Sequence, residues 1–137
     1  MLSTSLERQI GLDDLHDMRQ YVNDTLLAHG LDEELTASLV LVVDEWLTNI
    51  ITHGYTGEFG EVKISISFDP RDVHICIQDS GVAFDISSTT TAEKEMSVSG
   101  SAEGGLGLTL IRRLVSSITY TRLESGWNNT CFHKSLD

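Results

Sequence analysis

Three polar side chains, Glu45, Asn49 and His53, follow one another at four-residue intervals in a largely apolar segment. On an α-helix this spacing places consecutive members one turn apart on the same face. A carboxylate beside a carboxamide can offer a base and a neutral metal ligand side by side. Glu45 is therefore a candidate catalytic residue and Asn49 a candidate metal ligand, and a solvated helix face is the alternative. His53, near the expected helix end, is more often structural.

The segment Asp79-Ser80-Gly81 closes a predicted strand over residues 73–79. Strand alternation places the Asp79 carboxylate on the same face as three aliphatic side chains, toward the core. A carboxylate in that position needs a partner, and the exocyclic amine of a buried adenine would be one. Asp79 and Gly81 are thus candidate nucleotide-binding residues, although an ordinary Asp-Ser-Gly turn has the same sequence.

A glycine-rich run, consisting of Gly104, Gly105, Leu106, Gly107 and Leu108, opens a predicted helix. Glycines let backbone N–H groups approach phosphate oxygens, and a helix N-terminus favours negative charge. The run is not a Walker P-loop, because no Lys-Ser/Thr pair follows it, and no strand precedes it as in a dinucleotide fingerprint. It is therefore a candidate phosphate cradle, with a flexible hinge as the structural alternative.

The elements that must position these residues follow from hydrophobic periodicity. We expect helices over residues 12–29, 33–52 and about 106–115, and strands over residues 62–68, 73–79, 118–123 and 129–134. A Ser-, Thr- and Gly-rich loop at about 84–104 is long enough to act as a lid. This order predicts a single α+β domain over residues 1–137, a two-layer sandwich whose mixed, mostly antiparallel sheet carries helices on one face.

Composition excludes several classes of partner. The chain has 137 residues, a formal charge of −12 and no basic stripe, so we expect neither nucleic-acid nor anionic-membrane binding. The longest aliphatic run, residues 39–43, is too short to span a bilayer, and no apolar secretory core is present near the N-terminus. Cys76 and Cys131 are expected to be buried, reduced thiols, which favours a cytoplasmic location.

The motifs Glu45-Trp-Leu-Thr-Asn49 and Gly104-Gly-Leu-Gly-Leu-Thr-Leu-Ile-Arg-Arg-Leu114 give the chain a family resemblance. It resembles the histidine-kinase-like ATPase superfamily, and more narrowly the anti-sigma factor serine/threonine protein kinases of bacterial partner-switching systems. The resemblance implies that Asn49 binds Mg²⁺, that Glu45 is the base for the attacking hydroxyl, and that Asp79 and Gly81 lie at adenine. Gly105 and Gly107 would face the phosphates of ATP.

The implied activity is phosphorylation of an anti-sigma factor antagonist by Mg-ATP, with the same surface sequestering a sigma factor. Homodimerisation is also implied. Ala83 and Thr52 stand where the family often has a glycine or proline and a basic residue. Two further functions stay open: a nucleotide-dependent protein-binding regulator that lacks phosphotransfer, and an unrelated α+β binding protein without nucleotide.

Overall fold

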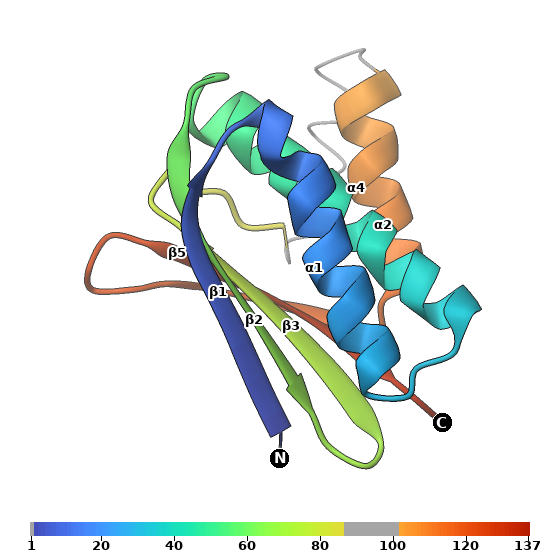
Figure 1. The fold of residues 1–137 in the computed structure, drawn as a ribbon. Coiled ribbons are helices and arrows are strands. Elements are labelled where there is room, and N and C mark those ends of the chain that lie inside the picture. Colours follow the sequence, from blue (N-terminus) through green and yellow to red (C-terminus); the bar gives the residue numbers. More distant parts are fainter. Residues whose placement is uncertain (1, 87–101) are drawn as a thin grey trace.

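The computed structural model describes residues 2–86 and 102–137, with side chains from Gly107 onward in the second range. One five-stranded sheet has the order β1-β2-β3-β5-β4, and each of these pairings is antiparallel. The helices α1, α2 and α4 cover one face of it (Figure 1). The bounds are β1 Leu2–Ile10, α1 Leu15–Ala28, α2 Glu33–Asn49, β2 Gly60–Phe68, β3 Asp72–Asp79, α4 Ala102–Leu114, β4 Ser117–Arg122 and β5 Asn128–Ser135.

The predicted α+β sandwich is confirmed, because alternation decides which face of each central strand meets the helices. Both β2 and β3 alternate between buried and half-buried residues along most of their length. Their core-facing side chains are Val62, Ile64, Ile66, Phe68, Val73, Ile75, Ile77 and Asp79. The Asp79 carboxylate therefore lies on the same core-facing side of β3 as the aliphatic side chains.

The central helix α2 starts where its sequence predicts. The Asp32 side chain accepts a hydrogen bond from the Leu35 N–H group at 2.7 Å, which caps the first turn. Among the described residues, Glu33–Gly54 is the one helical stretch long and apolar enough to cross a bilayer by length and composition alone. Here Leu39, Val43 and Leu47 are buried in the core. The packing of α2 inside the sandwich therefore accounts for its apolar character.

The end of α2 differs from a simple α-helical stop. Residues Ile50–Gly54 form a π-helical turn, in which the Tyr55 N–H group donates to the Ile50 carbonyl at 2.9 Å. Such turns are rare and are found preferentially at functional sites. The α-helix ends at Asn49 and His53 lies in the wider π-helical turn, so the four-residue spacing does not continue on one uniform helix.

The sequence prediction missed β1. This strand pairs antiparallel with β2 along its whole length, from Leu2 opposite Phe68 to Ile10 opposite Gly60. It is largely exposed at the edge of the sheet, and Ile10 is its one fully buried side chain. A strand with so few buried residues has a weak alternation pattern, and tertiary pairing rather than local sequence stabilises it.

The prediction for the cysteines was also wrong. Cys76 in β3 and Cys131 in β5 occupy directly opposite positions in the sheet and form a disulfide. Both side chains are half-buried, on the face opposite the core. Side chains at directly opposite positions of an antiparallel pair can approach to about 4.5 Å at Cβ, the upper end of the range that a disulfide spans.

Candidate functional site

A cavity of about 240 Å³ opens where the C-terminal end of α2 meets the C-terminal end of β3 and the start of β5. It brings together Asn49, His53 and Asp79, which are distant in sequence. A volume below the ~300–1,000 Å³ of typical small-molecule pockets suits one end of a ligand, such as a heteroaromatic ring. The lining residues are Trp46, Asn49, Ile50, His53, Gly54, Asp79, Val82, Ala83, Phe84 and Asn128.

Asp79 is the buried carboxylate of this cavity, with 3% of its surface exposed. Its Oδ1 accepts hydrogen bonds from the Gly81 N–H group at 2.9 Å and from Asn128 Nδ2 at 3.0 Å. Burial raises the pKa of Asp79 above its ordinary value, and these two hydrogen bonds oppose that effect. Within residues 2–86 and 107–137, both of its hydrogen bonds reach Oδ1. Oδ2 therefore has capacity to accept a hydrogen bond from a ligand.

Asn128 holds Asp79 in place, and the sequence analysis missed it. It is the first residue of β5 and lies directly opposite Asp79 in the sheet. Its Nδ2 also donates to the Val82 carbonyl at 3.1 Å, and its Oδ1 accepts from Tyr120 Oη at 2.5 Å and Arg122 Nη1 at 2.9 Å. Such a saturated amide fixes the carboxylate beside it. Only the pairing of β3 with β5 places Asn128 beside Asp79, and the sequence alone does not give that pairing.

Gly81 follows β3 and lies against Gly54, the last residue of the π-helical turn after α2. A Cβ atom there would lie 3.0 Å from the backbone of Gly54. The Val82 N–H group donates to the Gly54 carbonyl at 3.4 Å in the same contact. Absence of a side chain at Gly81 therefore allows the loop after β3 to meet the π-helical turn, and this contact forms one wall of the cavity.

Glu45 lies one helical turn before Asn49 and contacts α4. A Cβ atom on Gly107 would lie 2.6 Å from Glu45 Oε2, so this glycine makes room for the carboxylate. Burial, and secondarily the charge of Asp44, raise the pKa of Glu45. Asp44 is itself paired with Arg19 of α1 at 2.8 Å. A half-buried carboxylate with a raised pKa is a candidate general base.

The glycine-rich run lies within α4, which begins at Ala102 rather than after the glycines. Gly104 and Gly105 therefore belong to its first turn, whose N–H groups have no intrahelical acceptor. The Leu106 side chain lies outside the described part of the chain. The Leu108 side chain is buried in the core, so it packs rather than lines the cavity.

Most of the predicted lid also lies outside the described residues, which resume at Ala102. The preceding segment is anchored at Ile86, whose carbonyl accepts a hydrogen bond from Arg112 Nη2 of α4 at 2.7 Å. Phe84 and Ala83 lie on this segment and line the cavity, and the Phe84 ring lies 6.0 Å from that of Trp46. The described start of the predicted lid therefore borders the cavity.

These groups fit a nucleotide with its metal ion. Asp79 Oδ2 can accept from a ring amine, and the Asn49 carboxamide is a neutral oxygen ligand of the kind that Mg²⁺ accepts. The first turn of α4 offers N–H groups to an anion. Because Gly107 has no side chain, α4 can pack closely against Glu45.

Comparison with known proteins identifies the family of the chain. The histidine kinase-like ATPase domain matches residues 11–134. This chain belongs to that family. The matched range starts directly after β1, and the family resemblance seen in the sequence motifs is confirmed.

Two curated members of the family are serine or serine/threonine kinases by name. The chain is 27% identical to serine/threonine-protein kinase BtrW of Bordetella bronchiseptica, over 91% of this chain and 88% of BtrW. It is 30% identical to serine-protein kinase RsbW of Bacillus cereus, over 57% of this chain but 51% of RsbW. A chain in the crystal structure of the SiaB–SiaC complex from Pseudomonas aeruginosa shares the fold, with a TM-score of 0.63 at 11% identity, covering 96% of this chain and 89% of that one.

Proposed function

We propose that this protein is a serine/threonine protein kinase that uses Mg-ATP to phosphorylate an anti-sigma factor antagonist. One observation carries the proposal: a buried carboxylate, Asp79, and a carboxamide, Asn49, line the same cavity. The candidate base Glu45 lies one helical turn before Asn49 and is not among the residues that line this cavity. The kinase names of the relatives BtrW and RsbW support the same activity. Sequestration of a sigma factor completes the proposal for a partner-switching protein. Its proposed cytoplasmic location rests on that partner and not on the cysteines, which form a disulfide.

Phosphoryl transfer depends mainly on alignment and charge neutralisation. When bound, Mg²⁺ would neutralise phosphate charge and orient the transferred group. Asn49 would hold the ion through its amide oxygen, and Asp79 Oδ2 would orient the adenine ring. The N–H groups of the first turn of α4 would hold phosphate oxygens.

Glu45 would accept the proton of the attacking seryl or threonyl hydroxyl. Burial and the charge of Asp44 raise its pKa, which makes the carboxylate a better proton acceptor than an exposed glutamate. The absence of a side chain at Gly107 leaves room for the Glu45 Oε2 atom. The base therefore lies on the same helix as the metal ligand, one turn away.

Replacing Glu45 with glutamine tests the base. Because Gln keeps the shape and removes the proton acceptor, we expect Glu45→Gln to retain Mg-ATP affinity within about 2-fold. Transfer to a candidate antagonist should fall by roughly 10²–10⁴-fold, the usual contribution of general-base assistance. Calorimetry with Mg-ATP and mass spectrometry of the antagonist measure the two quantities.

Glu34→Gln is the matched control, because Glu34 is exposed in the first turn of the same helix. Transfer at the wild-type rate by Glu45→Gln would reject Glu45 as the base. ATP binding by the wild type without any phosphorylated antagonist would favour the regulator that lacks phosphotransfer. Indifference of thermal stability to millimolar Mg-ATP would reject the nucleotide site itself.

A further inference from the structure

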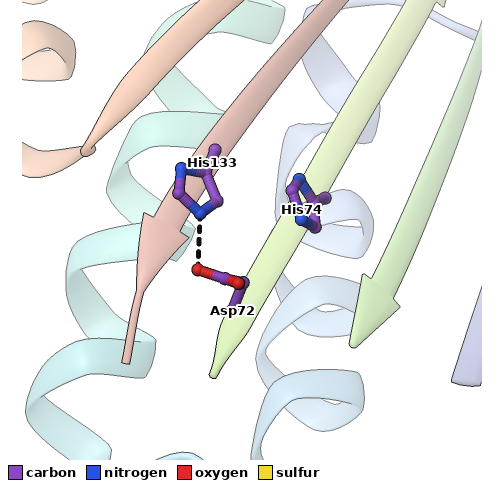
Figure 2. A group of neighbouring side chains, drawn as sticks. All are labelled: Asp72, His74 and His133. Atoms are coloured by element: carbon purple, nitrogen blue, oxygen red, sulfur yellow. Dashed lines mark hydrogen bonds and ion pairs between the residues drawn. The ribbon is translucent and has the colours of Figure 1, made fainter. Parts of the chain in front are cut away.

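A second group of polar side chains lies on the face of the sheet that the described helices leave uncovered. Asp72 and His74 of β3 and His133 of β5 point toward one another there (Figure 2). His74 and His133 occupy directly opposite positions in the sheet. All three side chains are half-buried, so an ion in solution can reach them.

The geometry of the group is close to that of a metal-binding shell. His133 Nε2 lies 2.6 Å from Asp72 Oδ1, and the two imidazole rings lie 4.8 Å apart between centroids. One ligand atom from each of the three residues falls within 4.8 Å of the others. Zinc bonds of about 2.0–2.2 Å place tetrahedral ligand atoms about 3.3–3.6 Å apart. Side-chain rotations that move the ligand atoms by roughly 1–2 Å would therefore bring all three within bonding distance of one ion.

The surroundings favour a cation. Ser117 Oγ lies 3.2 Å from His133 Nδ1, so it can accept from Nδ1–H when an ion replaces the proton that Nε2 shares with Asp72. A second carboxylate, Asp69 Oδ2, lies 3.9 Å from His74 Nε2. The chain as a whole has a formal charge of −12, which raises the local concentration of cations.

We propose that Asp72, His74 and His133 bind a divalent transition-metal ion of the zinc class. Two imidazole nitrogens with one carboxylate are a donor set that suits Zn²⁺ and its neighbours, whereas Mg²⁺ and Ca²⁺ prefer oxygen ligands. Three protein ligands leave the fourth tetrahedral position for water or for a group from a partner. The ion would connect the start of β3 to the end of β5.

This site is separate from the nucleotide cavity. Asp72 and Asp79 are the two ends of β3, and seven residues of strand correspond to about 23 Å. They also lie on opposite faces, since Asp79 faces the core and Asp72 does not. The disulfide of Cys76 and Cys131 lies on the metal-site face and withholds both thiols from the ion. Metal binding is therefore expected without nucleotide.

Calorimetric titration of the chelator-treated, oxidised protein with Zn²⁺ alone, in excess Mg²⁺, tests the proposal. We expect one ion per chain. Because loss of an outer-shell partner already costs about 10–100-fold in affinity, His74→Ala, His133→Ala and Asp72→Asn should each weaken binding at least about 10-fold. The visible spectrum of the Co²⁺-substituted protein should indicate nitrogen and oxygen ligands, and it should change in each variant.

Two controls keep the result interpretable. His16→Ala removes an exposed histidine of α1 and should leave Zn²⁺ affinity unchanged, as should Cys76→Ser/Cys131→Ser. Thermal unfolding in chelator verifies that each variant is folded, and Asp72→Asn keeps a side chain of the same shape. Wild-type affinity in folded Asp72→Asn and His74→Ala would overturn the site. Loss of binding in the cysteine variant alone would show that the ion does not depend on these three residues and would also overturn the site.

Discussion

At the scale of single residues, Asp79 is subject to two opposing effects. Burial raises its pKa, while hydrogen bonds from Asn128 and Gly81 stabilise the ionised form, and burial is the larger effect. An acid whose folded-state pKa is raised binds its proton more tightly in the folded state. Its contribution to stability is therefore present below the unfolded pKa and is lost as pH rises through the folded value.

Asp79→Asn separates binding from stability. Because the neutral amide removes the desolvated charge, we expect no loss of unfolding free energy at pH 7. As pH rises above 3.8, the ordinary pKa of an aspartate carboxyl, the unfolding free energy of the wild type should fall. This fall should be smaller in the variant. Nucleotide affinity should drop about 10–100-fold, as expected for losing a hydrogen bond to a charged group worth ~1.5–3 kcal/mol. Urea unfolding across pH, with ATP titration, measures both.

The wild type and variant would have parallel pH profiles if Asp79 were as easily ionised as an exposed carboxyl. Unchanged ATP affinity in Asp79→Asn would contradict its place at the adenine ring.

Gly107→Ala should affect the base without unfolding the protein. The added Cβ atom would lie 2.6 Å from Glu45 Oε2, so the carboxylate must move. Alanine is about 1 kcal/mol better than glycine inside a helix, which offsets the local crowding. We expect the unfolding temperature to be maintained and phosphotransfer to fall by roughly 10²-fold, as for a misplacement of about 1 Å. Transfer at the wild-type rate would show that Glu45 does not need its present position.

The sequence predicted some of these residues and not others for a physical reason. The spacing of Glu45 and Asn49 and the strand parity of Asp79 are local patterns, so they could be read before the fold was known. Asn128 acts through its pairing with Asp79 across 49 positions of sequence. No local pattern encodes that register, and an Asn beside a turn is an ordinary residue.

At the scale of elements, the close approach of the π-helical turn after α2 and the loop after β3 shapes the cavity. Gly81→Ala would place a Cβ atom 3.0 Å from the Gly54 carbonyl and Cα atoms, and backbone cannot rotate away as a side chain can. We expect a loss of about 1–3 kcal/mol in unfolding free energy, as for overpacking, and weaker nucleotide binding. Chemical denaturation and ATP titration test this.

Gly54→Ala is the matched control for stability, because a Cβ atom there meets its nearest neighbour at 3.8 Å, an ordinary contact. Equal stability of the two variants would show that the loop yields without cost.

Elements with strong periodicity were predictable, and those stabilised by pairing were not. Helix α2 and strands β2 and β3 bury many side chains, so their hydrophobic spacing is unambiguous. In β1, apolar Leu2, Leu6 and Ile10 are four positions apart, which fits a helix as well as a strand. Its nine pairs with β2 decide its structure.

At the scale of the whole molecule, the disulfide joins strands that are distant in sequence. Cys76 and Cys131 are separated by 55 positions, and they are neighbours only because β5 returns beside β3. Strand parity already placed Cys76 opposite the aliphatic face. The sequence alone could not pair it with Cys131, since that depends on register.

Reduction of this disulfide should destabilise the protein. Opening a closed loop of this length increases the entropy of the unfolded chain, and we expect a loss of about 2–4 kcal/mol in unfolding free energy. Denaturant titration with and without a thiol reductant measures it. Cys76→Ser/Cys131→Ser should be insensitive to reductant, and an equal response of both proteins would contradict a stabilising bond.

Arg19 has a consequence that reaches beyond its own helix. It belongs to α1, which contributes no side chain to the described cavity wall, yet it neutralises Asp44. Asp44 is the charge that makes Glu45 harder to ionise. The readiness of the proposed base to take a proton is thus set in part by Arg19, a half-exposed side chain outside the cavity wall.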